Sequence, residues 1–342
     1  MNYVNTNLKI TANGSNYNKH SFLDQIIGQP PTFIKDLQEE YRSFMRGKSA
    51  WTDLFVENEE VLAYADVNYK RGSSTFTVSV LNKKDETSEN FTMKVPESEK
   101  LSHIYVEDVQ LVGNELNLVT QNYRYDDFSN GEKHMYTIDL SSQTITNHEA
   151  IVEVPKGQND TYFDVQLIKT SPTNANEYLI LMKKEIQLIE DSESIREEVI
   201  NKEFISYNMA TKEKEIINVQ DLQLDSSGLS FYDGSTIYFT QFAGTELIVT
   251  PPYSLEDDQM GLVSRVQLSS ETDLVGGTLT TVKDGKLYVA STTDRESHSN
   301  IVVIVADLET GKTIYEGGEV AVKDASIAPD DFELYINELF LK

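Results

Sequence analysis

The stretch Asp108-Val109-Gln110-Leu111 recurs along the chain as Asp164-Val165-Gln166-Leu167 and again as Asp221-Leu222-Gln223-Leu224. Further aspartates stand at the head of short apolar stretches at a similar interval before and after these three copies. The full set, spaced 51 to 57 residues apart, is Asp53, Asp108, Asp164, Asp221, Asp273 and Asp324. A fixed period of this length, built from strand-like pieces, is typical of a repeat architecture.

Each repeat contains a second strand that turn residues introduce. Asn58-Glu59-Glu60 precedes Val61-Leu62-Ala63-Tyr64, and Asp284-Gly285-Lys286 precedes Leu287-Tyr288-Val289. Asn, Asp and Gly tolerate the positive φ of tight hairpin turns. We therefore expect each repeat to open with an inner strand that begins at its aspartate and pairs antiparallel with the second strand.

A third strand ends in a recurrent turn in three of the copies. The turns are Asp139-Leu140-Ser141-Ser142-Gln143, Asn208-Met209-Ala210-Thr211-Lys212 and Asp307-Leu308-Glu309-Thr310-Gly311. Each turn leads into a fourth, more polar strand, as in residues 145–154. Four antiparallel strands in each repeat, with the most polar one outermost, describe a propeller blade.

The turn at Asp307, together with the sequence Asp284-Gly285-Lys286-Leu287-Tyr288-Val289, resembles the blades of bacterial β-propellers over roughly residues 50–342. The resemblance implies an all-β fold of four-stranded antiparallel blades. Six aspartates predict six blades, starting near residues 50, 105, 161, 218, 270 and 321. The resemblance implies no particular activity, since propellers host binding proteins as well as enzymes.

Residues 1–49 differ from the repeats. The last repeat has room for only two strands, so we expect residues 4–12 to close the ring as an added strand and remove its exposed edges. A second feature is a set of apolar residues at helical spacing that follows Pro30-Pro31 and ends at Gly47: Phe33, Ile34, Leu37, Tyr41, Phe44 and Met45. This spacing predicts an amphipathic helix of about four turns packed on the propeller, with a shorter helix near residues 21–27.

The charge balance excludes several partners. The chain has 56 acidic and 29 basic residues, a formal net charge of −27. Such a surface repels nucleic acid and anionic lipid headgroups, which bind clustered Lys and Arg. No cysteine is present, which excludes disulfides and thiolate metal sites and fits either a cytosolic protein or an exported bacterial one. The abundance of Asn, Lys, Glu and Tyr resembles exported proteins of low-GC Gram-positive bacteria.

No apolar run is long enough to cross a bilayer. The longest, residues 301–306, is far shorter than the roughly 20 residues that a membrane-spanning helix needs. The chain begins with the polar stretch Met1-Asn2-Tyr3-Val4-Asn5 and ends on a strand-like segment. We expect it to be the extracytoplasmic, soluble part of a longer membrane-anchored protein.

The six repeat aspartates are the candidate site residues. If they lie on the innermost strands, the carboxylates of Asp53, Asp108, Asp164, Asp221, Asp273 and Asp324 approach a central channel. A ring of like charges raises the pKa of its members or recruits a cation, here Ca²⁺ or Mg²⁺. The alternative is a structural role, in which each aspartate accepts hydrogen bonds from turn amides and ties neighbouring blades together.

No catalytic residue can be assigned from the sequence. The five histidines show no zinc-binding spacing, and the nucleophile elbow and the glycine-rich phosphate loops are missing. Trp51 is expected to pack between helix and ring rather than to stack on a sugar. Two functions remain open. One is a non-catalytic binding or sensory module that contacts a protein partner or an envelope ligand through loop surfaces, and the other is a hydrolase or lyase with carboxylates in the central cleft.

Overall fold

The computed structural model describes residues 6–11, 14–19, 30–155, 160–168, 175–190, 195–217, 229–232, 236–243, 246–255, 259–260, 264–267, 279–292, 301–317 and 339. The chain divides into two compact units, Met1–Thr52 and Asp53–Lys342.

The first unit contains a hairpin and two helices. Strand β1 (Thr6–Thr11) pairs antiparallel with β2 (Gly14–Lys19), so its described partner is the adjacent strand. The last repeat, which was expected to accept this strand, lies outside the described residues. Helix α2 (Thr32–Glu40) buries Phe33, Ile34 and Leu37, and α3 (Arg42–Met45) buries Phe44 and Met45.

The predicted single helix is interrupted at Tyr41. Its backbone there adopts φ −116° and ψ 51°, outside the helical range. The hydrogen bonds from Tyr41 N to Leu37 O (2.8 Å) and from Met45 N to Tyr41 O (3.0 Å) persist across the break. The apolar spacing is therefore kept while the helix bends. Trp51 is 70% exposed, and its expected packing between helix and ring stays a prediction.

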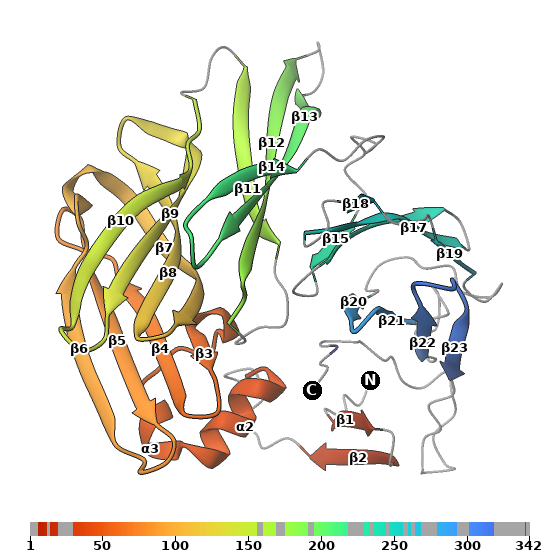
Figure 1. Cartoon of the computed structure of the whole chain (residues 1–342), viewed down its shortest axis with the longest axis horizontal. Helices are drawn as coiled ribbons and strands as arrows, with labels where there is room; N and C mark the ends of the chain where they lie inside the picture. The colour runs from red at the N-terminus through yellow and green to blue at the C-terminus, as the bar shows by residue number, and fades with distance from the viewer. Residues whose placement is uncertain are drawn as a thin grey trace, which may run out of the picture. The chain divides into compact units, whose positions relative to one another are not determined.

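The second unit consists of antiparallel sheets that follow one another in chain order (Figure 1). Sheet 1 comprises β3 (Phe55–Glu57), β4 (Val61–Asn68), β5 (Thr75–Asn82) and β6 (Ser88–Lys94), preceded by the short helix η1 (Thr52–Leu54). Sheet 2 follows helix η2 (Ser98–Lys100) and comprises β7 (Leu101–Val112), β8 (Glu115–Arg124), β9 (Asp127–Asp139) and β10 (Thr144–Val152). Sheet 3 comprises β11 (Thr161–Ile168), β12 (Tyr178–Glu190), β13 (Ile195–Asn208) and β14 (Lys214–Ile217).

Two further sheets complete the described part of this unit. Sheet 4 comprises β15 (Leu229–Tyr232), β16 (Thr236–Ala243), β17 (Glu246–Ser254), β18 (Gln259–Met260) and β19 (Ser264–Gln267). Strands β18 and β19 pair with opposite ends of β17, so the fourth position of this sheet is divided. Sheet 5 comprises β20 (Leu279–Lys283), β21 (Lys286–Thr292), β22 (Ile301–Asp307) and β23 (Thr313–Gly317).

This arrangement is propeller-like, as the sequence predicted. Four sheets of the described residues have four strands in up-and-down order, the topology of a blade. Strand β3 contacts β7, β11 contacts β15, and β15 contacts β20, as expected of first strands that lie innermost, whereas the main contact of β11 with sheet 2 is with β9. The described sheets do not establish six blades, because the repeat that begins at Asp324 lies outside the described residues, and that count remains a prediction.

Successive sheets are joined by apolar cores. One core combines sheet 1 residues such as Phe76 and Val78 with sheet 2 residues such as Leu118 and Tyr136. The opposite face of sheet 2 packs Val119 on sheet 3. Since each blade buries one face against each neighbour, stability is built pair by pair along the repeat.

The turns predicted after the third strands are confirmed, with the same geometry in three sheets. The side chains of Asp139, Asn208 and Asp307 each accept hydrogen bonds from backbone amides two or three residues on. The fourth following residue has positive φ in every copy: Gln143 at 55°, Lys212 at 64° and Gly311 at 68°. Its amide donates to the carbonyl of the first residue at 2.9 Å in all three turns.

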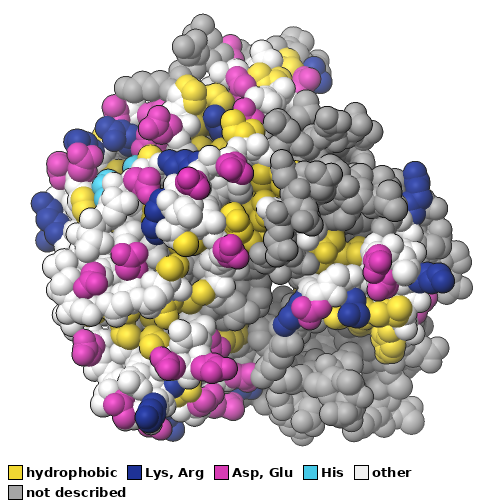
Figure 2. All heavy atoms as spheres, viewed as in Figure 1, with side chains coloured by type: hydrophobic (Ala, Val, Ile, Leu, Met, Phe, Trp, Pro, Cys, Tyr) yellow, Lys and Arg dark blue, Asp and Glu magenta, His cyan; other side chains and the backbone are white. Residues whose placement is uncertain are grey.

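In the three repeats whose aspartate is described, the inner strand does not begin at that aspartate, so the expectation is wrong for these copies. Asp53 lies in η1, ahead of β3, while Asp108 and Asp164 lie inside β7 and β11. Strand β7 already begins at Leu101, because the residues between Leu101 and Asp108 also pair with β8. Several of these residues are polar or aromatic, which is not the pattern of a buried strand. No helix among the described residues has the length and apolar character needed to cross a membrane. On the face shown in Figure 2, Asp and Glu are interspersed with Lys and Arg.

Candidate functional site

Two of the repeat aspartates, Asp108 and Asp164, accept a hydrogen bond from the glutamine two residues on, a donor other than the expected turn amides. Gln110 donates from Nε2 to Asp108 Oδ2 at 2.7 Å, and Gln166 makes the same bond to Asp164 at 2.7 Å. Residues two apart in a strand share a face, which is why the Asp-x-Gln spacing recurs. Gln110 also accepts a hydrogen bond from Asn176 N at 2.7 Å, and Asn176 precedes β12. The motif in sheet 2 is thereby tied to sheet 3.

A metal site at the six aspartates remains a prediction. Asp221, Asp273 and Asp324 lie outside the described residues. Within the described ranges, no three His, Asp or Glu side chains gather in a way that could hold a metal ion. Asp108 is 9% exposed, whereas the side chain of Asp164 is 37% exposed and lies 3.9 Å from Lys184 Nζ.

A row of aromatic side chains lies at one end of sheets 1 and 2. The ring of Tyr69, which follows β4, stacks on His103 of β7 with centroids 5.3 Å apart. His103 lies 6.2 Å from Tyr105, and Tyr105 lies 6.5 Å from Tyr123 of β8. Tyr69 and Tyr105 are 38% and 54% exposed. We call Tyr69, His103, Tyr105, Tyr123 and Tyr125 the aromatic strip.

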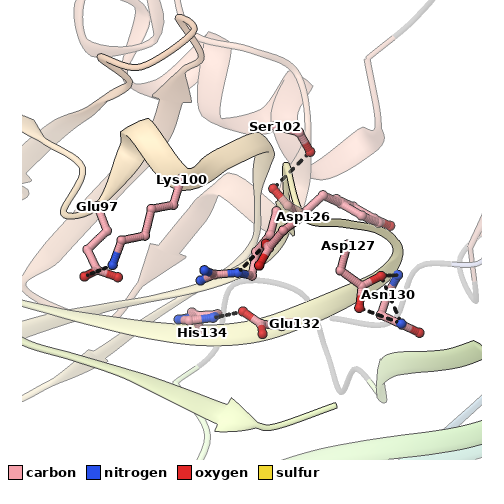
Figure 3. Close-up of polar contacts among 10 residues, drawn as sticks. Glu97, Lys100, Ser102, Asp126, Asp127, Asn130, Glu132 and His134 are labelled. Carbon is pink, nitrogen blue, oxygen red and sulfur yellow. Dashed lines mark hydrogen bonds and ion pairs between the residues drawn. The ribbon is translucent and has the colours of Figure 1, made fainter. Parts of the chain in front are cut away.

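Polar contacts hold the strip in place. A hydrogen bond with Tyr125 is the main cause that raises the pKa of Tyr69, and the Arg71 guanidinium lies 5.4 Å from the Tyr125 ring centroid. Ser102 donates to the backbone carbonyl of Tyr123 at 3.0 Å (Figure 3). In the same hairpin, Arg124 binds Asp126 at 3.1 Å.

Two β-bulges in β7 shape this surface. The register against β8 shifts between Leu101 and His103 and again between Val106 and Asp108, so Ser102 and Glu107 are extra residues. A bulge changes which face the following residues occupy. As a result, Tyr105 and Asp108 both lie on the face of sheet 2 whose core packs on sheet 3.

A pocket of about 460 Å³ adjoins the strip on this face. Its lining comes from β7, β8, β9 and β11: Tyr105, Glu107, Gln121, Tyr123, Lys133, Asp164, Val165, Gln166 and Leu167. We call it the sheet 2–3 pocket. Lys133 is 2% exposed and forms an ion pair with Glu107. Burial raises the pKa of Tyr123, and the nearby Glu107 carboxylate raises it further.

A polar relay lies on the opposite face of sheet 2. His134 Nε2 lies 3.0 Å from Glu132 Oε2, and His134 Nδ1 lies 3.0 Å from His148 Nε2 (Figure 3 shows the Glu132 contact). The Tyr136 ring stacks on His148 at 4.3 Å, and Asn122 donates to the Tyr136 hydroxyl at 3.1 Å. The hydrogen bond from His134 lowers the pKa of Glu132. Burial lowers the pKa of His148 and raises the pKa of Tyr136 to about 12.

The sequence reasoning missed the strip and the pocket. Part of a signal was present: His103 and Tyr105 alternate before the turn at Gly113-Asn114, and Tyr123 and Tyr125 alternate after it. A regular register would place His103 opposite Arg124, and only the extra residue Glu107 brings it opposite Tyr123.

The sheets and their turns define the class: the chain is an all-β protein with a propeller-like arrangement. No family model matches the chain, and no curated protein matches it either. Solved structures do. The polysaccharide lyase Uly1 is 13% identical with a TM-score of 0.43, over 69% of this chain and 53% of that one.

Two further similar structures belong to other enzymes. The acylaminoacyl peptidase of Pyrococcus horikoshii is 10% identical with a TM-score of 0.38, over 76% of this chain and 38% of that one. An ACO/RPE65 chimera is 9% identical with a TM-score of 0.40, over 77% of this chain and 60% of that one. This chain thus spans between 38% and 60% of the length of these three proteins. Similarity at this level carries no functional argument.

Proposed function

We propose that the protein is a non-catalytic binding module whose ligand surface is the aromatic strip with the sheet 2–3 pocket. The observation that carries the proposal is the row of exposed rings of Tyr69, His103 and Tyr105, in which Tyr69 and Tyr105 each stack on His103, continued edge-on by the half-buried Tyr123. Clustered exposed aromatic side chains mark interaction sites, because their burial contributes much of the binding free energy. The ligand is a protein partner or a component of the cell envelope.

The setting we propose is extracytoplasmic, as part of a membrane-anchored protein of a Gram-positive bacterium. The composition, rich in Asn, Lys, Glu and Tyr, and the net charge of −27 support it, and the absence of cysteine is compatible with it. The acidic surface argues against nucleic acid as a ligand, since nucleic acid binding depends on clustered cations.

An enzyme is the second candidate, because Glu107 and Asp164 both line the pocket. A glycosidase or lyase requires such acid and base groups. Both carboxylates already have partners, however: Glu107 binds Lys133, and Asp164 binds Gln166. These partners favour a binding role over proton transfer.

The proposed function can be tested by retention of the protein on isolated Gram-positive cell envelopes. Replacing His103 and Tyr105 together by Ala should weaken retention about tenfold or more, because hot-spot aromatics each contribute on the order of 1–2 kcal/mol. The control is Tyr315→Ala, which removes a tyrosine of similar exposure (57%) from sheet 5. Equal retention of the double variant and the wild type would disprove the proposed surface.

A further inference from the structure

We propose that the sheet 2–3 pocket binds one ring of a neutral polysaccharide and that the aromatic strip contacts neighbouring rings of the same chain. This inference rests on the proposed function, because it names the ligand class of the same surface. The pocket volume of about 460 Å³ lies within the range of about 300–1,000 Å³ that is typical of small-ligand sites.

The polar groups of the pocket include both hydrogen-bond donors and acceptors. Glu107 and Asp164 accept, Lys133 donates, and the amides of Gln121 and Gln166 do both, as do the two tyrosine hydroxyls. A sugar hydroxyl also donates and accepts at the same time. A ring that carries several hydroxyls therefore matches this mixed set better than a ligand with groups of one kind.

The charged groups that line the pocket are already engaged by other side chains of the protein. Glu107 is paired with the buried Lys133, and Asp164 accepts from Gln166 at 2.7 Å with Lys184 3.9 Å away. A charged ligand would have to compete with these contacts for Glu107, Lys133 or Asp164. The net charge of −27 also repels polyanions at long range. An uncharged polar ligand incurs neither cost.

The tyrosines supply the apolar contact that such a ligand needs. Tyr105 and Tyr123 both line the pocket, with ring centroids 6.5 Å apart. The C–H groups on one face of a sugar ring pack on aromatic rings, while a tyrosine hydroxyl remains free to hydrogen-bond. His103 and Tyr69 continue the row in steps of 6.2 and 5.3 Å, so a chain of several rings gains contacts outside the pocket.

The test is affinity electrophoresis in native gels that contain a soluble uncharged glucan, mannan or xylan. We expect at least one of them to retard the wild type, and Tyr105→Ala and Asp164→Asn to lose tenfold or more in affinity. Tyr105 is largely exposed and Asp164→Asn keeps the shape of the side chain, so both variants should fold. Two controls should bind like the wild type: Tyr315→Ala, and Glu153→Gln at an exposed carboxylate between sheets 2 and 3.

Three outcomes would overturn the ligand class. The first is that no uncharged polysaccharide retards the wild type, and the second is that only a uronate polymer or chitosan oligomers retard it. The third is that Tyr105→Ala and Asp164→Asn bind as tightly as the wild type. Retention on envelopes that depends on Tyr105 and disappears after protease treatment would refute the polysaccharide and keep the binding function. New reducing ends released by the wild type would support the polysaccharide as ligand and contradict the non-catalytic role.

Discussion

At the scale of single residues, the repeated Asp-x-Gln motif is explained by one hydrogen bond within a strand. The glutamine orients the aspartate in sheets 2 and 3 alike, yet the two copies differ in their surroundings. Gln110 is buried and also accepts from Asn176 N, whereas Gln166 is exposed and contacts Lys184 at 3.3 Å. The same sequence therefore connects two sheets in one copy and lines a pocket in the other.

This difference predicts unequal costs for the same substitution. Gln110→Ala should lower the free energy of unfolding by roughly 1–3 kcal/mol, because it removes an acceptor from Asn176 and a donor from the buried Asp108. Gln166→Ala, at an exposed position, should change it by no more than about 0.5 kcal/mol. Urea unfolding of both variants measures the difference, and equal losses would contradict the inter-sheet role of Gln110.

At the scale of elements, the three recurrent turns show what local sequence can predict. Such a turn depends only on neighbouring residues. An Asp or Asn side chain accepts hydrogen bonds from the following amides, and the residue four positions on has a positive φ. These turns were therefore found from the sequence. The bulge at Glu107 was not, since an extra residue in β7 is visible only when the partner strand is known.

The strip illustrates a second limit of sequence reasoning. Its members His103 and Tyr105 belong to one strand, but Tyr69 comes from sheet 1 and reaches His103 only after the two sheets have packed. Burial of Lys133 depends likewise on its pairing with Glu107 across strands. Tertiary contacts of this kind are not encoded in a period or a turn motif.

The relay on the other face of sheet 2 predicts a pH dependence. Burial, and next the neighbouring His134, lower the pKa of His148, while Glu97 opposes this more weakly. The unfolded chain then binds the proton more readily, so the free energy of unfolding falls as the pH drops below about 6.5 toward the lower folded pKa. The lowered pKa of Glu132 adds a loss in the same direction near and below its ordinary value of 4.5.

Replacing His148 by Gln should flatten this slope between pH 7 and 5 relative to the wild type. Asn147→Gln, at an exposed position next to His148, is the matched control and should leave the slope unchanged because neither side chain titrates. Thermal unfolding at several pH values provides the comparison, which also cancels the general effect of the net charge. A slope that His148→Gln leaves intact would mean that other groups cause the acid sensitivity.

At the scale of the whole molecule, the second unit is a series of sheets, each packed on the next. The core between sheets 3 and 4 includes Phe204 and Tyr253, and that between sheets 4 and 5 includes Tyr238 and Leu287. Such nearest-neighbour packing holds the framework while leaving the strand ends and hairpins open to ligands. The strip and the pocket lie where sheet 2 meets its two neighbours.

Hydrogen exchange of the full chain with and without isolated envelope material tests the central claim most directly. The account predicts slower exchange in residues 101–107 and 119–125, which carry the strip and much of the pocket, with little change in sheet 5. Protection confined to sheet 5, or no protection anywhere under conditions in which the protein is retained, would contradict it.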